Sequence, residues 1–367
     1  MLSAPMRITH VAPLVAPLRA AQAGGAQVVL TELARRLVER GEEVEVIAAP
    51  GSRIEGVAVH TVRGGGPFPE ALLHHHAPEA ATTPAPAWPA LQAAAYLRAA
   101  TRVRTTAPDV VHAHALDWPA FYALAAAGLP TVHTLHLGPL DRAAADAARA
   151  AAGTTPRPRF VAVSRACAAQ WRGLVPVDAV IGNGADPGSI PFRERPEPDL
   201  ALVAGRIAPE KGTHLAVEAA LRAGLRVLLV GGVYDRKYFD EQVAPLLASG
   251  GVEHTGPVTQ RRLAALYGRA AVAIVASLWE EPFGMVALEA NLAGTPVAGF
   301  ARGALPEVVG SSGGVLTGDA SVRGLVRAIT AAVALDRRRV RRQAARRHPI
   351  GRMVDRYQHL YREMTQP

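Results

Sequence analysis

The chain has 367 residues, of which 49% are hydrophobic and 19% are charged, and its net charge is +9. This composition is typical of a globular protein, and the length predicts two or three domains of about 150 residues each. No apolar run approaches the ~20 residues of a membrane-spanning helix, and no secretion signal is evident. Because Cys167 is the only cysteine, an intramolecular disulfide and a cysteine-based zinc site are excluded, and we expect a cytoplasmic protein.

Much of the positive charge lies near the carboxyl terminus, where Asp336 is followed by seven arginines between Arg337 and Arg347. Such a run favours a solvated helix face, with peripheral contact to a membrane surface as the alternative. Only 5% of residues are aromatic and no nucleic-acid-binding module is recognisable, so we expect no nucleic-acid partner.

Short Val/Ile/Leu runs alternate with Ala/Leu/Arg-rich stretches along the chain, which is typical of βαβ units and parallel sheets. The first half predicts strands at 7–11, 43–48, 109–112, 131–135 and 160–163, and helices at 27–40, 91–105, 119–126 and 165–171. The turn-rich stretches 182–188 and 193–198 predict a linker. The second half predicts strands at 200–204, 226–230, 252–255, 272–276 and 296–299.

Residues 64–89 interrupt the first of these two halves. They contain three consecutive glycines, the three adjacent histidines His74 to His76 and a Thr-Pro-Ala-Pro segment, which together predict a long loop. Adjacent side chains point in different directions, so these histidines are poorly placed to share one metal ion. A mobile lid or an acceptor-contacting loop is the expected role.

A glycine-bounded loop carries the first candidate site, Gly205-Arg206-Ile207-Ala208-Pro209-Glu210-Lys211-Gly212. Lys211 is one of only two lysines in a chain whose lysines and arginines number 40. This bias favours a specific role for a compact ammonium group at this position. We expect Arg206 and Lys211 to hold an anion such as a diphosphate, and the alternative is an ordinary exposed loop charge.

A second candidate site lies in the segment Ser277 to Ala290. The turn Pro282-Phe283-Gly284 follows a predicted strand and opens a helix, so its backbone N–H groups suit a phosphate. Glu281 precedes this turn, and Glu289 lies inside the helix. Two carboxylates that flank a diphosphate site indicate a nucleotide sugar, because acidic residues bind ribose hydroxyls in other nucleotide sites.

Several motifs, taken together and in their order along the sequence, resemble those of the retaining GT-B glycosyltransferases of family four. The resemblance covers nearly the whole chain. The matching residues are Gly24 and Gly25, Asn183 to Asp186, Arg206 and Lys211, Glu281 and Glu289, and Gly303 to Val309. The resemblance implies an α/β protein of GT-B architecture, with two doubly wound Rossmann-like domains facing a central cleft. It implies an acceptor-binding domain over 1–185, a donor-binding domain over 186–348 and a carboxyl-terminal helix over 349–367 that packs back on the first domain.

The resemblance also assigns roles to the candidate residues. Arg206 and Lys211 would hold the donor diphosphate, Glu281 the donor sugar and Glu289 the ribose. The other expected donor contacts are Gly24, Gly25, Pro282, Phe283 and Gly284. The expected catalytic residues are His136, Glu281, Arg206 and Lys211.

Histidines at two predicted strand ends complete the expected site. His136 matches the histidine that lies beside the donor sugar in similar enzymes, where it orients the reacting centre. His133 is expected to be a buried strand histidine bonded to a carbonyl group. His112 and His114 are expected on the floor of the cleft. The expected acceptor contacts are His114, Asp117 and Trp118.

These assignments predict a hexosyltransferase that uses a nucleotide-sugar donor, with UDP as the first expected nucleotide, and a small-molecule or glycan acceptor. The family implies retention of anomeric configuration. No Asp-x-Asp motif accompanies the donor residues, so we expect neither a metal nor a cofactor. Replacing Lys211 with Ala should weaken donor binding, with little effect on folding if its loop is exposed. The alternatives are a nucleotide-sugar epimerase of the same fold and a non-catalytic nucleotide-sugar-binding scaffold, and no oligomeric state is predicted.

Overall fold

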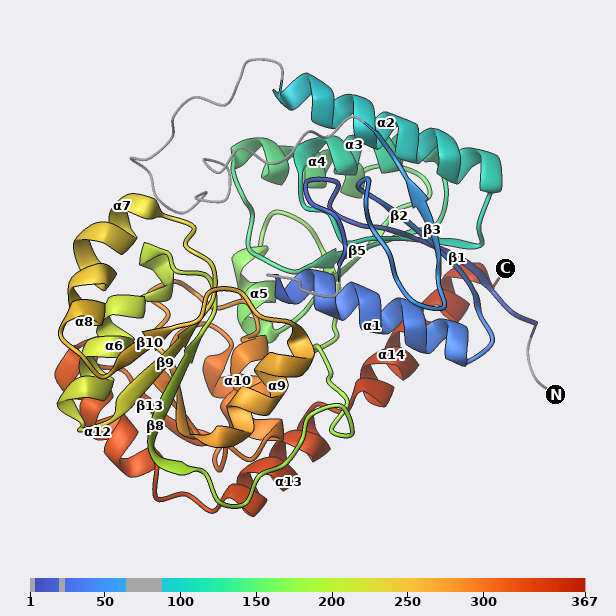
Figure 1. Cartoon of the computed structure of the whole chain (residues 1–367). Helices are drawn as coiled ribbons and strands as arrows, with labels where there is room; N and C mark the ends of the chain where they lie inside the picture. The colour runs from blue at the N-terminus through green and yellow to red at the C-terminus, as the bar shows by residue number, and fades with distance from the viewer. Residues whose placement is uncertain (1–3, 20–23, 64–87, 367) are drawn as a thin grey trace. The chain divides into compact units, whose positions relative to one another are not determined.

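A computed structural model of the chain describes residues 4–19, 24–63 and 88–366 (Figure 1). Its contacts divide these residues into two compact units. The N-terminal unit contains the described residues up to Gly182 and those from Gly351 onward, and the C-terminal unit contains Asn183–Ile350. The predicted loop 64–89 and its three histidines lie outside the described residues, except for the last two positions of the loop, which belong to a helix. No helix in the described ranges is both long and apolar enough to cross a membrane.

Seven parallel strands form the sheet of the N-terminal unit, in the order β3-β2-β1-β4-β5-β6-β7. The strand order reverses between β1 and β4, and the carboxyl ends of strands at such a switch point are where doubly wound sheets bind ligands. The strands are β1 (Arg7–Val11), β2 (Glu43–Ala48), β3 (Ala58–Thr61), β4 (Val110–Ala113), β5 (Thr131–Leu135), β6 (Arg159–Ala162) and β7 (Val177–Val180).

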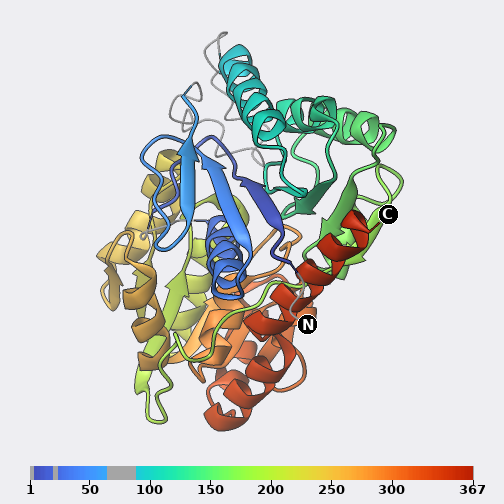
Figure 2. The same ribbon diagram turned by 90° about the vertical axis from the view of Figure 1, so that its right-hand side faces the viewer.

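Helices cover both faces of this sheet. The helices are α1 (Gly25–Glu39), α2 (Trp88–Thr106), α3 (Trp118–Ala127), α4 (Arg142–Ala152), α5 (Arg165–Gln170) and α14 (Ile350–Thr365). Val111 and Ala113 of β4 belong to a buried apolar cluster that also contains residues of α2 and α3. Strand side chains alternate between faces, so the intervening His112 points the other way, where it bonds to Tyr361 of α14. Figure 2 shows α14 running alongside this sheet.

The C-terminal unit has a six-stranded sheet in the order β10-β9-β8-β11-β12-β13, and every ladder is parallel. Its strands are β8 (Glu197–Ala204), β9 (Arg226–Val230), β10 (Val252–His254), β11 (Ala270–Val275), β12 (Val297–Phe300) and β13 (Gly314–Thr317). Its helical elements are the 3-10 turn η2 (Pro209–Lys211), α6 (Thr213–Arg222), α7 (Arg236–Tyr238), the π-helical η3 (Phe239–Val243), α8 (Ala244–Ala248), α9 (Gln260–Arg269), α10 (Met285–Leu292), α11 (Leu305–Val309), α12 (Val322–Ala332) and α13 (Arg337–Arg347).

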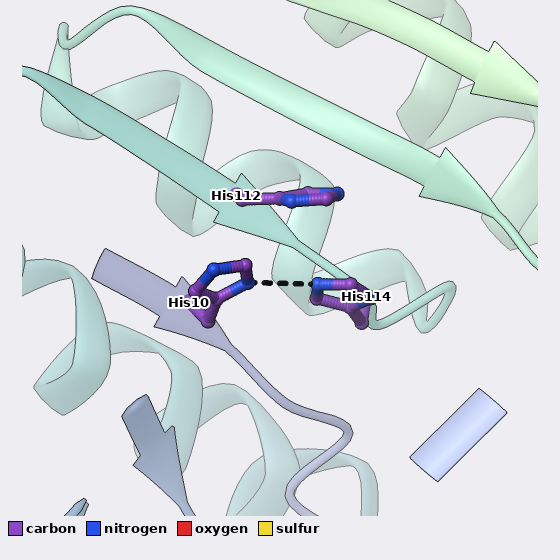
Figure 3. Close-up of side chains that lie close together, drawn as sticks. All are labelled: His10, His112 and His114. Atoms are coloured by element: carbon purple, nitrogen blue, oxygen red, sulfur yellow. Dashed lines mark hydrogen bonds between the residues drawn. The ribbon is translucent and has the colours of Figure 1, made fainter. Parts of the chain in front are cut away.

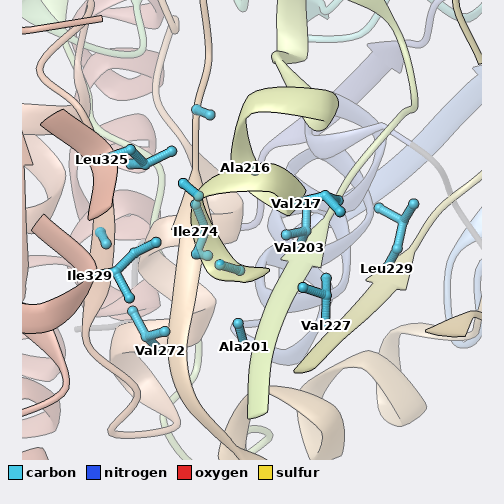
Figure 4. Close-up of a cluster of buried hydrophobic side chains, with 14 of the residues drawn as sticks. Ala201, Val203, Ala216, Val217, Val227, Leu229, Val272, Ile274, Leu325 and Ile329 are labelled. Carbon is cyan, nitrogen blue, oxygen red and sulfur yellow. The ribbon is translucent and has the colours of Figure 1, made fainter. Parts of the chain in front are cut away.

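An apolar cluster of the C-terminal unit lies between its sheet and the helices α6 and α12 (Figure 4). Alternate residues of the central strands contribute to it, among them Val203, Val272 and Ile274. Leu325 and Ile329 of α12 close the cluster from the helical side. Each fully buried side chain of this kind contributes about 1.5–3 kcal/mol, so the cluster provides a rigid base for the loops that follow the strands.

The predicted strands and helices are present with boundaries shifted by a few residues. The prediction omitted β3, β7 and β13, which are short strands at sheet edges and therefore carry a weak apolar pattern. It also omitted α4, an alanine-rich helix capped by Asp141, whose carboxylate accepts a hydrogen bond from the Ala144 N–H at 2.7 Å. The predicted linker 193–198 is wrong at its end, because Glu197 and Pro198 open β8.

The arginine run near the carboxyl terminus forms α13, and part of it is structural. Arg337 donates to the carbonyl oxygens of Arg193, Gly268 and Ala270, all at 2.9 Å. Burial, together with the positive charge of the neighbouring Arg193, lowers the pKa of Arg337 to about 10. Arg341 likewise donates to backbone carbonyl groups. The interpretation of the run as a solvated helix face is therefore wrong for these two arginines.

Candidate functional site

The loop that carries Arg206 and Lys211 follows β8 and is held by backbone hydrogen bonds. Ile207 N–H donates to the Gly232 carbonyl oxygen at 2.9 Å, which ties the loop to the end of neighbouring β9. Pro209 opens the 3-10 turn η2, and Lys211 ends it. Gly212 then adopts φ 59, a left-handed conformation that favours glycine.

Gly212 also brings this loop against the end of β11. A Cβ atom at Gly212 would lie under 3.0 Å from the Ala276 carbonyl oxygen, so a larger residue does not fit. Two residues further on, Leu278 N–H donates to the Glu210 carbonyl oxygen at 2.8 Å. The two candidate segments predicted from the sequence therefore lie together at one edge of the sheet.

Glu281 is the centre of the hydrogen-bond network at this edge. Its Oε2 accepts bonds from Lys211 Nζ at 2.9 Å, Ser277 Oγ at 2.8 Å and Trp279 Nε1 at 2.9 Å. Burial raises the pKa of the Glu281 carboxyl, but the Lys211 ammonium and the three hydrogen bonds outweigh it and hold the pKa below its ordinary value. Glu281 is therefore an ionised carboxylate, and among the described residues its Oε1 has no assigned hydrogen bond.

Two aromatic rings flank the cations of the site. Lys211 Nζ lies 4.6 Å from the ring centroid of Trp279, and the Arg206 guanidinium lies 5.4 Å from that of Tyr234. Arg206 also forms an ion pair with Glu210 at 3.6 Å. Arg206 and Lys211 thus belong to one loop, and both are anchored by carboxylates and aromatic faces.

The turn Pro282 to Gly284 is buried and leads directly into α10. Gly284 adopts φ 93, and a Cβ atom there would lie under 3.0 Å from the Leu305 side chain. Gly303 fits against the Glu281 backbone in the same way, because a Cβ atom would lie under 3.0 Å from the Glu281 nitrogen and oxygen. The close packing fixes Glu281 at the amino end of α10, where the helix dipole is positive.

Glu289 lies one turn into α10 and has a different environment from Glu281. Burial raises the pKa of its carboxyl to about 7, and the neighbouring Tyr267 hydroxyl opposes this shift in part. The two predicted carboxylates are therefore both in α10 or directly before it, with pKa values displaced in opposite directions. Such displaced pKa values are typical of functional sites.

The predicted residues of the N-terminal unit lie at several strand and helix ends. Gly24 is the N-cap of α1, and Gly25 is its first residue. Asp117 is the N-cap of α3 and accepts a hydrogen bond from the Tyr96 hydroxyl at 2.7 Å. Trp118 follows it and packs edge-on against Tyr122, with ring centroids 6.2 Å apart.

Four histidines gather on the face of the N-terminal sheet that α14 covers. In register, His10 of β1 lies beside His112 of β4, and His114 is two residues further on the same face (Figure 3). His114 Nε2 lies 3.0 Å from His10 Nδ1, and His114 Nδ1 lies 2.9 Å from His136 Nε2. His112 instead bonds through its two nitrogens to Tyr361 Oη and Thr134 Oγ1, both at 2.6 Å.

These contacts correct three expectations about the histidines. His112 and His114 are 0% and 2% exposed, so they do not line an open floor. Both nitrogens of His114 are engaged, which does not fit the predicted acceptor contact. His133 is buried as expected, between Phe121 and Phe160, but neither of its ring nitrogens has a hydrogen-bond partner among the described residues, so the predicted carbonyl bond is wrong.

The prediction missed three residues that complete these networks. Ser277 and Trp279 lie in the predicted segment Ser277 to Ala290, and the spacing of two residues from Ser277 to Trp279 and from Trp279 to Glu281 was the available signal. His10 was missed because its strand was used only to assign the fold. Combining the period of two in a strand with the usual strand order would have placed His10 next to His112.

Comparisons with known proteins identify the family of the chain. Residues 23–189 match the family model Glycosyltransferase Family 4, and residues 190–348 match Glycosyl transferases group 1. The D-inositol 3-phosphate glycosyltransferase of Frankia alni is 33% identical, over 84% of this chain and 86% of its own length. The enzyme of the same name from Mycolicibacterium smegmatis is 30% identical, over 86% of this chain and 81% of its own length.

Solved structures share the fold over almost the whole chain. Sucrose-phosphate synthase from Thermosynechococcus elongatus gives a TM-score of 0.79 at 18% identity, covering 98% of this chain and 99% of its own. HepE from Anabaena, solved with UDP and glucose, gives 0.74 at 18% identity, covering 98% and 100%. The family matches favour the transferase prediction over the epimerase and scaffold alternatives. The chain belongs to the group 1 glycosyltransferases of family 4, and it is a hexosyltransferase of GT-B fold.

Proposed function

We propose that this hexosyltransferase moves a hexosyl group from a UDP-sugar to a small phosphorylated polyol or a related sugar acceptor, with retention and without a metal ion. The observation that carries the donor half of this proposal is the contact between Lys211 and Glu281, which joins the cationic loop to the carboxylate segment at 2.9 Å. One edge of the C-terminal sheet thereby offers two cations for a diphosphate and a carboxylate for a sugar.

In this proposal the C-terminal unit binds the donor. Arg206, Lys211 and the first N–H groups of α10 face the growing negative charge of the leaving diphosphate. Oε1 of Glu281 accepts a hydrogen bond from a hydroxyl of the donor sugar, while Oε2 remains bonded to Lys211. Glu289 accepts hydrogen bonds from the ribose hydroxyls, and it does so most strongly when its carboxyl is ionised. The turn Pro282-Phe283-Gly284 contributes to the shape of the donor site and offers backbone groups, but it carries no charged side chain.

The N-terminal unit supplies the acceptor side and His136. Gly24 and Gly25 open α1 without side chains, which suits close approach of a substrate, and Asp117 and Trp118 provide a carboxylate and an aromatic face. The phosphorylated polyol as acceptor class rests on relatives named as D-inositol 3-phosphate glycosyltransferases. The choice of UDP as the donor nucleotide rests on its frequency in such donors and on its presence in the similarly folded HepE.

The transfer needs no covalent intermediate with the protein. The bond between the sugar C1 and the β-phosphate oxygen breaks, and a bond from the acceptor hydroxyl forms on the same face. The hydroxyl proton leaves with the nucleoside diphosphate. Arg206 and Lys211 stabilise the charge that grows on the β-phosphate, a task that a divalent metal performs in enzymes with an Asp-x-Asp motif.

A transfer assay tests the proposal directly. The protein is incubated with D-inositol 3-phosphate and, in separate reactions, UDP-glucose, UDP-galactose, UDP-N-acetylglucosamine or GDP-mannose, each once in EDTA and once with Mg²⁺. Mass spectrometry should detect one glycosylated product with a UDP-sugar, and NMR should show an anomeric configuration equal to that of the donor. Transfer only from GDP-mannose, an inverted product or a strict need for Mg²⁺ would contradict the corresponding part of the proposal.

A further inference from the structure

Three of the four clustered histidines are joined end to end, and we call them the histidine chain: His10, His114 and His136. Their rings are linked Nδ1 to Nε2 and Nδ1 to Nε2, at 3.0 Å and 2.9 Å. His10 is fully buried, whereas His136 keeps 6% of its surface exposed. The histidine chain therefore runs from the interior of the sheet to His136, which follows the end of β5.

All three rings are neutral at physiological pH. Burial lowers the pKa of His10 to about 3 and that of His136 to about 4. Burial also holds the pKa of His114 well below its ordinary value, and the neighbouring His112, His136 and His10 lower it further. A neutral imidazole carries one N–H and one bare nitrogen, so His114, whose two nitrogens are both bonded, donates on one side and accepts on the other.

This rule leaves only two arrangements for the whole chain. In the first, His10 Nδ1–H donates to His114, His114 Nδ1–H donates to His136, and His136 carries its own hydrogen on Nδ1. In the second, every hydrogen bond is reversed, and His10 carries its hydrogen on Nε2. The tautomer of His136 is therefore coupled to that of His10 through His114.

The far end of the chain decides between the two. His10 Nε2 is buried and has no hydrogen-bond partner among the described residues. Buried N–H groups without an acceptor are rarer in proteins than acceptors without a donor, so the bare nitrogen belongs at this position. The first arrangement satisfies this condition, and the second leaves an orphan N–H in the core.

We propose that His114, anchored by His10, is a positioning residue that holds His136 as its Nδ1–H tautomer. His136 Nδ1 takes no part in the hydrogen bonds of the histidine chain. It is therefore a hydrogen-bond donor for a substrate oxygen. The functional part of this inference rests on the proposed role of His136 beside the transferred sugar. A fixed donor orients that sugar without the need to select one of two tautomers during each turnover.

A metal centre is the competing explanation of the same cluster. One ligand nitrogen each from His10, His112 and His114 lie within 4.8 Å of one another. However, both nitrogens of His112 are hydrogen-bonded at 2.6 Å, and the facing nitrogens of His10 and His114 are bonded to each other. A metal would have to displace the bond between His10 and His114 and one of the two bonds of His112, so the hydrogen-bonded histidine chain is the better account.

Nitrogen NMR of the wild-type protein labelled with ¹⁵N-histidine reads the tautomer without any assay of activity. The His136 signals are assigned by their loss in His136→Gln. We expect protonated Nδ1 and bare Nε2 at pH 7. Protonated Nε2, or an averaged signal, would overturn the inference. A joint shift of the His10, His112 and His114 signals with one equivalent of Zn²⁺ would overturn it in favour of a metal centre.

Two substitutions of His114 then test positioning. His114→Asn keeps an N–H donor near the Nδ1 position, whereas His114→Leu removes it. We expect His114→Leu to mix the His136 tautomers and lower kcat about 10-fold, the equivalent of one net hydrogen bond, with UDP affinity unchanged. His114→Asn should keep the tautomer and restore most of kcat. His133→Leu is the matched control, because His133 is equally buried but lies on the opposite face, outside the chain.

Equal loss of kcat in His114→Leu and His114→Asn would overturn the positioning role. The tautomer assignment and the proposed function can be contradicted independently of each other. If no sugar is transferred and no nucleotide binds, the proposed function is wrong while the wild-type NMR result stands. If transfer occurs with His136 in the other tautomer, the proposed function stands and the histidine chain has been assigned wrongly.

Discussion

Lys211 Nζ lies 2.9 Å from Glu281 Oε2, although the two residues are 70 positions apart in the sequence. They meet because β8 and β11 are neighbours in a parallel sheet, whose carboxyl ends share one edge. The Lys211 side chain is 22% exposed and the Glu281 side chain 12%. Lys211 is thus a partly buried partner of a carboxylate as well as a candidate ligand for phosphate.

Lys211→Ala should therefore lower the stability of the C-terminal unit. Removing one partner of a buried ion pair leaves the other charge uncompensated, which costs about 3 kcal/mol. Hydrogen exchange of β8 and β11 in the full-length protein measures the loss. This expectation replaces the small effect on folding that the sequence suggested for an exposed loop, and a variant as protected as wild type would contradict it.

Lys237→Ala is the matched control for that experiment. Lys237 is the only other lysine of the chain, and it is exposed on the short helix α7 of the same unit. Its removal should leave hydrogen exchange unchanged. The double variant Lys211→Met/Glu281→Gln should recover part of the lost stability, because neither remaining side chain is charged.

Gly212→Ala should destabilise the C-terminal unit more than Gly224→Ala. Both glycines have positive φ, 59 and 77, so an alanine at either position bears the left-handed backbone cost of about 1–2 kcal/mol. Only Gly212 approaches another backbone group, the Ala276 carbonyl oxygen. Urea unfolding should show an additional loss of about 1–3 kcal/mol for Gly212→Ala, the usual cost of overpacking. Equal losses would show that the close approach is unimportant.

Glu289 should make the stability of the C-terminal unit depend on pH. Its pKa is raised from 4.5 to about 7 in the folded state, so the folded protein holds this proton more tightly than the unfolded chain. The stabilisation is fully present below pH 4.5 and is lost as the pH rises to about 7. Urea midpoints measured across this range should fall less with pH in Glu289→Gln than in wild type.

Nucleotide binding should show the opposite dependence on pH. If the ionised Glu289 carboxylate accepts the ribose hydroxyls, UDP affinity rises as the pH passes about 7, where the group loses its proton. UDP itself titrates with a phosphate pKa of about 6, so the informative quantity is the difference between wild type and Glu289→Gln. Identical pH profiles of the two proteins would remove Glu289 from the ribose site.

The sequence predicted the parallel-sheet architecture because apolar strands and helical stretches alternate clearly in both halves of the chain. It also predicted which loops carry the cations and the carboxylates. The edge strands β3, β7 and β13 escaped because short strands with one neighbour bury little apolar surface. Residue spacing alone did not reveal that Lys211 is bonded to Glu281, since that contact depends on strand order and on the close fit of Gly212.

The histidines show a second limit of inference from sequence. His112, His114 and His136 were singled out as residues at strand ends, yet their partners are His10, Thr134 and Tyr361. Tyr361 comes from a helix more than two hundred residues later in the chain. Long-range pairings of this kind leave no local periodicity, so burial and tautomer become visible only in the folded unit.

Calorimetric titration with UDP in the presence of EDTA tests the central claim most directly, using wild type, Lys211→Ala and Lys237→Ala. We predict one UDP site per chain in wild type and Lys237→Ala, and binding about 100-fold weaker in Lys211→Ala, as expected for the loss of a charge-assisted hydrogen bond to phosphate. Equal affinity in wild type and Lys211→Ala, or no binding of UDP by folded wild-type protein, would contradict the donor site proposed at Arg206 and Lys211.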